Sequence, residues 1–411
     1  MNKLIKNQIS LLKPSATLAI NEESNRLKNR GKKIYKFGFG QSPFPIPENI
    51  VLSLKNNASK NKYLPMQGLE ELRLVIANYL NKNNYNNFKS DNIIVGPGSK
   101  ELMLLINIAF KGEILLPAPS WVSYQPQASI AKNKVHWIQT SRDSNWFPTA
   151  KQIENKIKSI KNKNLLLFLN SPNNPSGTVC KNLKEIAAIS KKYKLIILSD
   201  EIYSNLTFDN KYKSISNFYP EGTIVSTGLS KWCGAGGWRL GFFAIPNELD
   251  QLKRSLKILC SESFTSVSAP IQYAAVEAYT GDYSIYLEKV KKILFCVGMY
   301  VYENLKSNAV NILKPEGGFY LFPEFVKAKF LSSSDMCKNI LDKTGVALLP
   351  GSDFGLGSKK MIARLSYTDF DGKNFLKNTS GSKNLHEDDI KKYAPNIVDG
   401  VSKLKEWSNA L

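Results

Sequence analysis

Hydrophobic and polar positions follow two different periods along the first two thirds of the chain. Apolar residues recur every three or four positions, as is typical of helices, at 69–81, 100–110, 151–160 and 182–193. Short and almost wholly apolar runs alternate with them, at 92–95, 113–116, 165–169, 195–199 and 223–226. Because such runs are typical of strands buried on both faces, the alternation predicts a mainly parallel sheet between layers of helices.

The N-terminal region has a less regular pattern. A helix is expected at 16–29, where an amphipathic stretch lies between Ser15 and Gly31, two residue types that are common at helix ends. A strand is expected at 34–37. The prolines at 43, 45 and 47 then exclude a helix and predict an extended crossover.

From about residue 247 the pattern changes to long helices, which continue to Ser307. Strand candidates follow near 310, 319, 346 and 362, and a C-terminal helix is expected from 387. We interpret this region as part of a smaller α+β domain, formed by residues 1–45 and 281–411. A large domain of residues 46–280 would contain the parallel sheet.

The length and composition also favour a compact protein with two domains. A chain of 411 residues is too long for a single hydrophobic core, and 43% of the residues are hydrophobic. No apolar run approaches the roughly 20 residues of a membrane span, and the first residues lack the apolar core of an export signal. We therefore expect a cytoplasmic protein without a transmembrane helix.

Charged residues, cysteines and histidines narrow the range of partners. The formal net charge is +22, but the lysines are spread along the whole chain, so we interpret the charge as a compositional bias and expect no nucleic-acid partner. The five cysteines are odd in number and lack the spacing of redox or metal motifs. With only two histidines, no histidine-based metal site is expected.

Four of the predicted strands end in polar or glycine-rich strings. Val95 is followed by GPGSKE, Leu169 by NSPNNPSG, Leu198 by SDEIY and Val225 by STGLSK. In a parallel sheet these ends lie along one edge, where α/β proteins bind their ligands. The sequence therefore predicts one site at this edge, built from segments that are distant in the chain.

Three of these strings carry candidate chemistry. The backbone N–H groups of residues 98–100 begin a predicted helix, where they would face an anion. Asp200 places a carboxylate directly after a buried strand, where the loss of hydration demands a cationic partner. Lys231 precedes a glycine-rich run and Arg239, so an amine and a guanidinium could together hold an aldehyde and a phosphate. Each string on its own is also compatible with an ordinary turn or helix cap.

The order and spacing of the strings resemble the class I and II aminotransferases, which are fold-type I enzymes dependent on pyridoxal phosphate. The resemblance covers nearly the whole chain. It rests on the strings above and on SATLAI (15–20), GQSPFPIPENI (40–50), YLPMQGLEELR (63–73), PAPSWVSY (117–124), PEGGFYLF (315–322), LLPGSDFG (348–355) and ARLSY (363–367). It implies an α/β large domain with a mainly parallel seven-stranded sheet, a smaller α+β domain, and a homodimer with shared active sites.

The resemblance also implies a role for each candidate residue around the cofactor ring. Lys231 would bind the cofactor aldehyde as a Schiff base and later move the substrate proton. Asp200 would pair with the pyridinium nitrogen, which keeps the ring able to withdraw electrons. Asn174 and Tyr203 would form hydrogen bonds with the phenolic oxygen, and Trp121 would stack on the ring face.

Further residues are implied to hold the cofactor phosphate and the substrate. The phosphate would be bound by Gly98, Ser99, Lys100, Ser230 and Arg239. Tyr63 would reach the same site from the partner subunit. Arg364 would hold the substrate α-carboxylate through two charge-assisted hydrogen bonds of about 1.5 to 3 kcal/mol each, the alternative being an interdomain salt bridge. Gly40 would let the backbone approach this carboxylate, and Trp121 and Asn174 would also contact the substrate.

The expected activity is transfer of an amino group from an L-amino acid to a 2-oxo acid, with 2-oxoglutarate as the expected acceptor. A lyase or β-eliminating enzyme with the same cofactor is the alternative. A serine acyl-transferase is a second alternative. It rests on the short strings SLLK (10–13), SDN (90–92) and KTG (343–345), which occur in the order known from β-lactamases.

Overall fold

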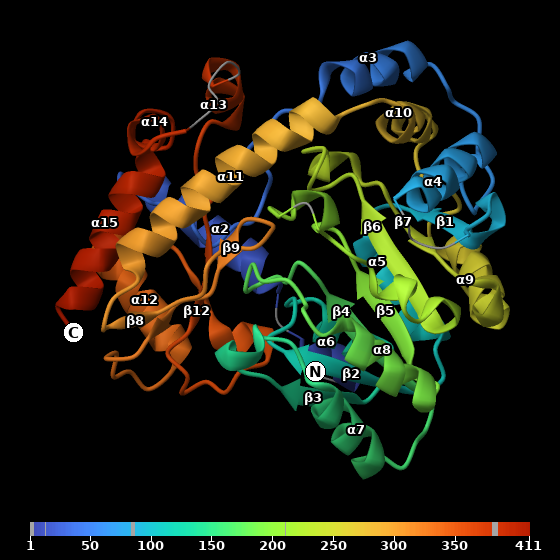
Figure 1. The fold of residues 1–411 in the computed structure, drawn as a ribbon, viewed down its shortest axis with the longest axis horizontal. Helices are drawn as coiled ribbons and strands as arrows, with labels where there is room; N and C mark the ends of the chain where they lie inside the picture. The colour runs from blue at the N-terminus through green and yellow to red at the C-terminus, as the bar shows by residue number, and fades with distance from the viewer. Residues whose placement is uncertain (1–3, 13, 84–86, 210, 380–384) are drawn as a thin grey trace.

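The computed structural model describes residues 4–12, 14–83, 87–209, 211–379 and 385–411. The ribbon has two parts, and the long helix α11 (Ser284–Leu305) runs diagonally from one to the other (Figure 1). The first part contains a large sheet with its helices, and the second contains small sheets and the C-terminal helices. Helix α2 (Ala16–Asn29) lies with the second part, although it is near the start of the chain. The domain boundaries expected at 46 and 280 stay a prediction.

The large sheet has seven strands in the order β1-β7-β6-β5-β4-β2-β3. All neighbouring pairs are parallel except those of β7, which is antiparallel to both β1 and β6. The strands are β1 (Ile93–Gly96), β2 (Glu113–Ala118), β3 (Val135–Gln139), β4 (Leu165–Asn170), β5 (Ile196–Asp200), β6 (Thr223–Gly228) and β7 (Gly241–Ala244). The predicted fold class, α/β with a mainly parallel seven-stranded sheet, is confirmed.

Both faces of this sheet are covered by helices, which explains the continuous apolar runs in its strands. Successive strand residues point to opposite faces. Along β4, Leu166 and Phe168 pack beneath α5 and α9, whereas Leu167 and Leu169 pack on the other face beneath α7 and α8. The helices around the sheet are α3 (Glu48–Asn57), α4 (Glu70–Lys82), α5 (Ser99–Ala109), α6 (Tyr124–Ile130), α7 (Ala150–Ser159), α8 (Leu183–Lys192), α9 (Asp250–Ser263) and α10 (Ala269–Thr280).

The second part is built on two short antiparallel sheets. The strands are β8 (Val310–Asn311) paired with β10 (Glu324–Phe325), and β9 (Tyr320–Leu321), β12 (Ala363–Ser366) and β11 (Leu349–Pro350) in the order β11-β12-β9. The remaining helices are α1 (Asn7–Ser10), α12 (Ser333–Thr344), α13 (Gly372–Asn378), α14 (Glu387–Tyr393) and α15 (Pro395–Asn409). Tyr35 joins the N-terminal segment to this part through backbone hydrogen bonds of 2.9 Å with Gly345 and 3.0 Å with Ala347.

Several predictions of secondary structure need correction. The strand expected at 34–37 is only an isolated bridge between Tyr35 and Val346, and the strand expected near 346 lies later, at β11. The helix expected from 387 is divided before Pro395, because proline cannot continue the hydrogen bonding of α14. The sequence does not predict β3, because the polar residues His136 and Gln139 interrupt its apolar pattern at the edge of the sheet.

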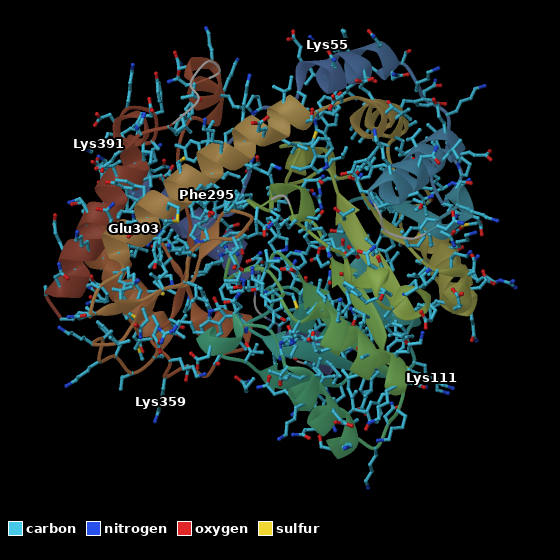
Figure 2. All side chains as sticks on the ribbon, in the orientation of Figure 1. Lys55, Lys111, Phe295, Glu303, Lys359 and Lys391 are labelled. Carbon is cyan, nitrogen blue, oxygen red and sulfur yellow. The ribbon has the colours of Figure 1, made fainter. Side chains whose placement is uncertain are left out.

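The charged side chains extend outward from many elements (Figure 2). The labelled Lys55, Lys111, Lys359 and Lys391 lie on different sides of the molecule, so these four charges do not form one patch. Within the described part of the chain, every helix is too short or too polar to cross a lipid bilayer.

Candidate active site

A pocket of about 440 Å³ lies between the carboxyl ends of the parallel strands and the second part of the molecule. Each of the four strings that follow predicted strands contributes to its wall, through Ser99, Asn174, Asp200 and Lys231. The second part contributes Tyr320 from β9 and Arg364 from β12. The pocket therefore brings together side chains that are separated by most of the length of the chain.

Asp200 is the last residue of β5 and is only 4% exposed. The hydroxyl of Tyr124, at the start of α6, donates a hydrogen bond to its Oδ2 atom at 2.5 Å, and the N–H of Ile202 donates to Oδ1 at 3.3 Å. Burial raises the pKa of Asp200 from 3.8 to about 6, although these two donors and the charge of Lys231 oppose the shift. The carboxylate therefore lacks a full compensating charge and is poised to pair with a cation.

Lys231 extends into the pocket from the loop after β6. Its Nζ atom donates to the backbone carbonyl of Gly40 at 2.9 Å and lies 5.6 Å from the ring centroid of Tyr203. Burial lowers the pKa of Lys231 from its ordinary value, and the guanidinium groups of Arg364 and Arg239 lower it further. The neutral amine, which is the nucleophilic form, is therefore more available here than on an exposed lysine.

Tyr203 lies three residues after Asp200, and its ring is packed edge to face against Phe319 and Tyr320. Its hydroxyl lies 3.0 Å from the hydroxyl of Tyr320. Burial raises the pKa of Tyr203 well above its ordinary value, so the phenol stays protonated at neutral pH. We call Asp200, Tyr203 and Tyr320, together with Tyr124, which is hydrogen-bonded to Asp200, the inner end of the pocket.

Arg364 is a buried cation without a salt bridge among the described residues. It is 1% exposed, and its two terminal nitrogens donate to the Asn174 side-chain oxygen at 3.0 Å and to the Gly38 carbonyl at 2.7 Å. Its Nε atom has no hydrogen-bond partner in the described residues. Within the described residues, Arg364 therefore does not form the interdomain salt bridge considered as the alternative. A buried guanidinium with neutral partners is instead ready to bind an anion.

The outer end of the pocket consists of Ser99, Lys100 and Arg239, and Gly98 directly precedes Ser99 in the chain. Gly98 precedes α5 with a φ of 87°, and Arg239 has a φ of 57°. A Cβ atom on Gly98 would lie 2.3 Å from Arg239 Nη2, so the guanidinium can lie here only against a glycine. Arg239 donates to the Gly236 carbonyl at 2.7 Å, and Lys100 lies over the Trp121 ring at 5.6 Å. Burial and the charge of Arg239 lower the pKa of Lys100.

The other predicted site residues divide into two groups. Trp121, Ser230 and Gly40 also line the pocket. Tyr63 does not line it and is 90% exposed. The strings of the acyl-transferase alternative do not meet in the pocket either, since 90–92 precedes β1, 343–345 ends α12, and Lys13 lies outside the described residues.

Sequence reasoning assigns no role to Tyr124 or Tyr320, although both make hydrogen bonds at the inner end. Each lies within a string that carries the family resemblance: Tyr124 ends PAPSWVSY, and Tyr320 is part of PEGGFYLF. Their phenols were detectable as candidates, because a tyrosine beside other site residues can supply a hydrogen bond. Their hydrogen-bond partners were not detectable, because no local pattern shows which strand end each tyrosine faces.

Comparison with known sequences identifies relatives along most of the chain. The family model described as "Aminotransferase class I and II" matches residues 32–374. The chain is 32% identical over 383 residues to an aspartate aminotransferase of Bacillus sp. strain YM-2, which covers 89% of this chain and 95% of that protein. It is 29% identical to an asparagine–oxo-acid transaminase of Streptococcus mutans, with the same shares of 89% and 95% covered.

Solved structures show the same fold. The alanine aminotransferase of Pyrococcus furiosus matches with a TM-score of 0.86 and covers 99% of this chain and 100% of that chain, at 23% identity. The family match includes every segment that carries the pocket from Gly40 to Arg364. This chain therefore belongs to the class I and II aminotransferases, a family that depends on pyridoxal phosphate.

Proposed function

We propose that this chain transfers an amino group from an L-amino acid to a 2-oxo acid in two half-reactions at the pocket described above. One observation carries the proposal: the amine of Lys231, the buried carboxylate of Asp200 and the uncompensated guanidinium of Arg364 line the same pocket. Transamination needs a nucleophilic amine, an acid that keeps the cofactor ring protonated, and a cation for the substrate carboxylate.

The outer end fits the cofactor phosphate. Helix α5 begins at Ser99, and the first N–H groups of a helix have no partner inside it. Lys100 and Arg239 add two positive charges beside them, and their effect on each other is repulsive until an anion is bound. Arg239 lies so close to Gly98 that a side chain at position 98 would collide with the guanidinium. We assign Gly98, Ser99, Lys100, Ser230 and Arg239 to phosphate binding.

The inner end fits the cofactor ring. Pyridoxal phosphate supplies an aldehyde that condenses with amines and a protonated ring that withdraws electrons from the substrate α-carbon. Asp200 would pair with the ring nitrogen, and because this cation would compensate the charge of the carboxylate, Asp200 would stay ionised at neutral pH. Asn174 and Tyr203 would donate hydrogen bonds to the phenolic oxygen, and Trp121 would cover a ring face.

We assign substrate binding to Arg364 and proton transfer to Lys231. Arg364 binds the substrate α-carboxylate, assisted by the backbone at Gly40, and so orients the α-carbon toward Lys231. The Lys231 amine would accept the α-proton of the substrate and later return it, and the bound cofactor would supply the electron withdrawal that makes this proton transfer possible. The lowered pKa of Lys231 favours the neutral form that must accept the proton.

The proposal also covers the substrates and the assembly. The relatives are named for aspartate, asparagine and alanine, so these three donors, with 2-oxoglutarate as acceptor, are the first to test. We propose a cytoplasmic homodimer in which Tyr63 of one subunit reaches the phosphate site of the other. Its high exposure in the single chain leaves it free for such a contact, and a Tyr63→Phe variant with weaker cofactor binding would support this role.

A spectroscopic experiment tests the proposed function. Addition of pyridoxal phosphate should give the wild-type protein a visible absorbance, which an amino donor abolishes and 2-oxoglutarate restores. Lys231→Ala should show neither change. A wild-type protein without visible absorbance, or a Lys231→Ala variant that still transaminates, would contradict the proposal. Release of ammonia and pyruvate without an oxo acid would indicate the β-eliminating alternative instead.

A further inference from the structure

We infer that Tyr320 is a positioning residue for Tyr203: its hydroxyl donates a hydrogen bond to the Tyr203 hydroxyl, which leaves the Tyr203 proton for the cofactor phenolic oxygen. The inference rests on the proposed function and adds to it a residue from the second part of the molecule. Tyr320 lies on β9, whereas Tyr203 follows β5, and the two are 117 residues apart in the chain.

The two phenols form an isolated pair. Their oxygens are 3.0 Å apart, their ring centroids are 5.7 Å apart, and the rings are inclined at 81°. Tyr320 is 2% exposed, and among the described residues Tyr203 is the one hydrogen-bond partner of its hydroxyl. No carboxylate or carbonyl within the described residues therefore competes for the Tyr320 proton.

Close contacts on both sides fix the position of Tyr320. A Cβ atom on Gly40 would lie 1.9 Å from the Tyr320 hydroxyl oxygen, and a Cβ atom on Gly177 would lie 2.0 Å from the Tyr320 backbone carbonyl. In the small sheet, Tyr320 is paired with Ser366 of β12. The phenol thus has little freedom to turn away from Tyr203, and glycine is required at both neighbouring positions.

The donor direction follows from the proton count. Each phenol has one proton to donate, and only one of the two protons can lie between oxygens that are 3.0 Å apart, so one phenol donates and the other accepts. If Tyr203 donates to the negatively charged cofactor oxygen, Tyr320 must donate to Tyr203. Two donors in series polarise each other, which strengthens the bond to the charged oxygen. Burial keeps the Tyr203 phenol protonated at neutral pH, as this arrangement requires.

Several charged or titratable groups face the two phenols, and their charges also affect any pH midpoint measured at this site. These groups are Lys231 after β6, Asp200 on β5, Tyr124 on α6, Arg364 on β12 and Tyr367 after β12. The Arg364 guanidinium lies 4.7 Å from the Tyr320 ring centroid, so loss of the hydroxyl leaves this packing intact. A Tyr320→Phe substitution therefore removes one hydrogen bond and preserves the charges around the site.

The inference predicts a shift in the pH midpoint of the visible absorbance of the bound cofactor. With the cofactor bound, its phenolic oxygen and the Lys231 nitrogen would share a proton, and a weaker hydrogen bond from Tyr203 would make this oxygen more basic. The proton shared by the phenolic oxygen and the Lys231 nitrogen would then be lost only at higher pH. Tyr320→Phe should raise the midpoint by about 0.5 to 1 pH unit, and Tyr203→Phe by about 1 to 2 units, as expected for loss of a neutral and a charge-assisted hydrogen bond.

Three further variants test the inference. The double variant Tyr203→Phe/Tyr320→Phe should have the midpoint of Tyr203→Phe, because Tyr320 acts only through Tyr203. Tyr367→Phe is the matched control: Tyr367 is also buried in this region, and its hydroxyl is directed to the Gly318 carbonyl at 3.4 Å. Its midpoint should equal that of the wild type. Gly40→Ala, whose Cβ atom would displace the Tyr320 hydroxyl, should raise the midpoint without changing Tyr320 itself.

The possible results separate this inference from the proposed function. An unshifted pH midpoint in Tyr320→Phe, or additive midpoint shifts in the double variant, would overturn the role of Tyr320. The proposed function would stand in either case if the wild-type protein titrates normally. Equal shifts in Tyr320→Phe and Tyr367→Phe would also overturn it. If Tyr320→Phe does not fold, an unshifted midpoint in Gly40→Ala serves as the refuting result. A wild-type protein without visible absorbance would refute the proposed function.

Discussion

At the inner end of the pocket Asp200 is 4% and Tyr203 3% exposed, whereas Arg239 at the outer end is exposed to solvent. The inner groups are connected by hydrogen bonds between side chains, from Tyr124 to Asp200 and between Tyr203 and Tyr320. At the outer end, Arg239 donates to two backbone carbonyls and faces no carboxylate among the described residues.

This difference separates two physical tasks within one pocket. At the inner end, the loss of hydration dominates, so protonation states depend on a few buried neighbours and little on salt. At the outer end, the Arg239 guanidinium is exposed to solvent, so it attracts an anion as a hydrated charge beside the N-terminus of α5. Substitutions at the inner end should therefore change the reaction rate, and those at the outer end should change cofactor affinity.

The largest effect is expected from Asp200→Asn. Asparagine cannot carry the negative charge that keeps the cofactor ring protonated, so kcat should fall about 10³-fold, corresponding to the 3 to 5 kcal/mol of a broken buried ion pair. Cofactor affinity should fall much less. Single-turnover rates with an amino donor, measured at low and at high salt, test this expectation. A loss of rate that salt restores would contradict the assignment of Asp200 to the buried end.

The same substitution should stabilise the cofactor-free protein. The folded-state pKa of Asp200 is about 6 and the reference value is 3.8. Between these values the folded state binds more protons than the unfolded state, so its free energy of unfolding falls as pH rises from 4 to 6. The wild type should lose up to about 3 kcal/mol over this range, and Asp200→Asn should not.

Urea unfolding of the cofactor-free proteins at several pH values measures this difference. The gap between variant and wild type should be largest above pH 6 and should close near pH 4. Asp143→Asn, a substitution at an exposed position, is the matched control and should follow the wild type. A constant gap at all pH values would mean that the substitution acts through packing and that the Asp200 carboxyl does not titrate in this range.

A smaller effect, on cofactor affinity and not on reaction rate, is expected at the outer end from Arg239→Ala. Loss of one charge-assisted contact of about 1.5 to 3 kcal/mol should raise the dissociation constant of pyridoxal phosphate about 10- to 100-fold, with kcat at saturating cofactor nearly unchanged. The wild-type affinity should fall as salt is added, and that of the variant should fall less steeply. Arg254→Ala, on the exposed face of α9, is the control. A loss in kcat alone would remove the distinction between the two ends.

The same contrast explains how much of the site could be predicted from the sequence. Lys231, Asp200 and residues 98–100 follow buried apolar runs, and the carboxyl ends of parallel strands share one edge. Their convergence therefore follows from local patterns and one rule of topology. Arg239 was identifiable for the same reason, because it lies in the string that begins with Ser230.

The remaining parts depend on contacts that no local pattern encodes. The Tyr124–Asp200 bond joins residues 76 positions apart, and the Tyr203–Tyr320 contact joins residues 117 positions apart. Which tyrosine faces which strand end is decided by the packing of the second part of the molecule on the sheet. The strand expected at 34–37 is wrong for the same reason, since Tyr35 gains only one bridge in the folded chain.

The smallest effect is expected from Tyr124→Phe, which removes the hydroxyl at Asp200 Oδ2 and leaves the ring packed against Trp121 and Phe168. Loss of one hydrogen bond of about 0.5 to 1.5 kcal/mol should lower kcat about 2- to 10-fold, because Asp200 is then less well oriented toward the ring nitrogen. Tyr193→Phe, whose hydroxyl donates to Glu154 at the surface, should retain the wild-type rate. Equal rates in the two variants would show that the buried carboxylate needs no positioning by a phenol, and that its burial alone distinguishes the inner end.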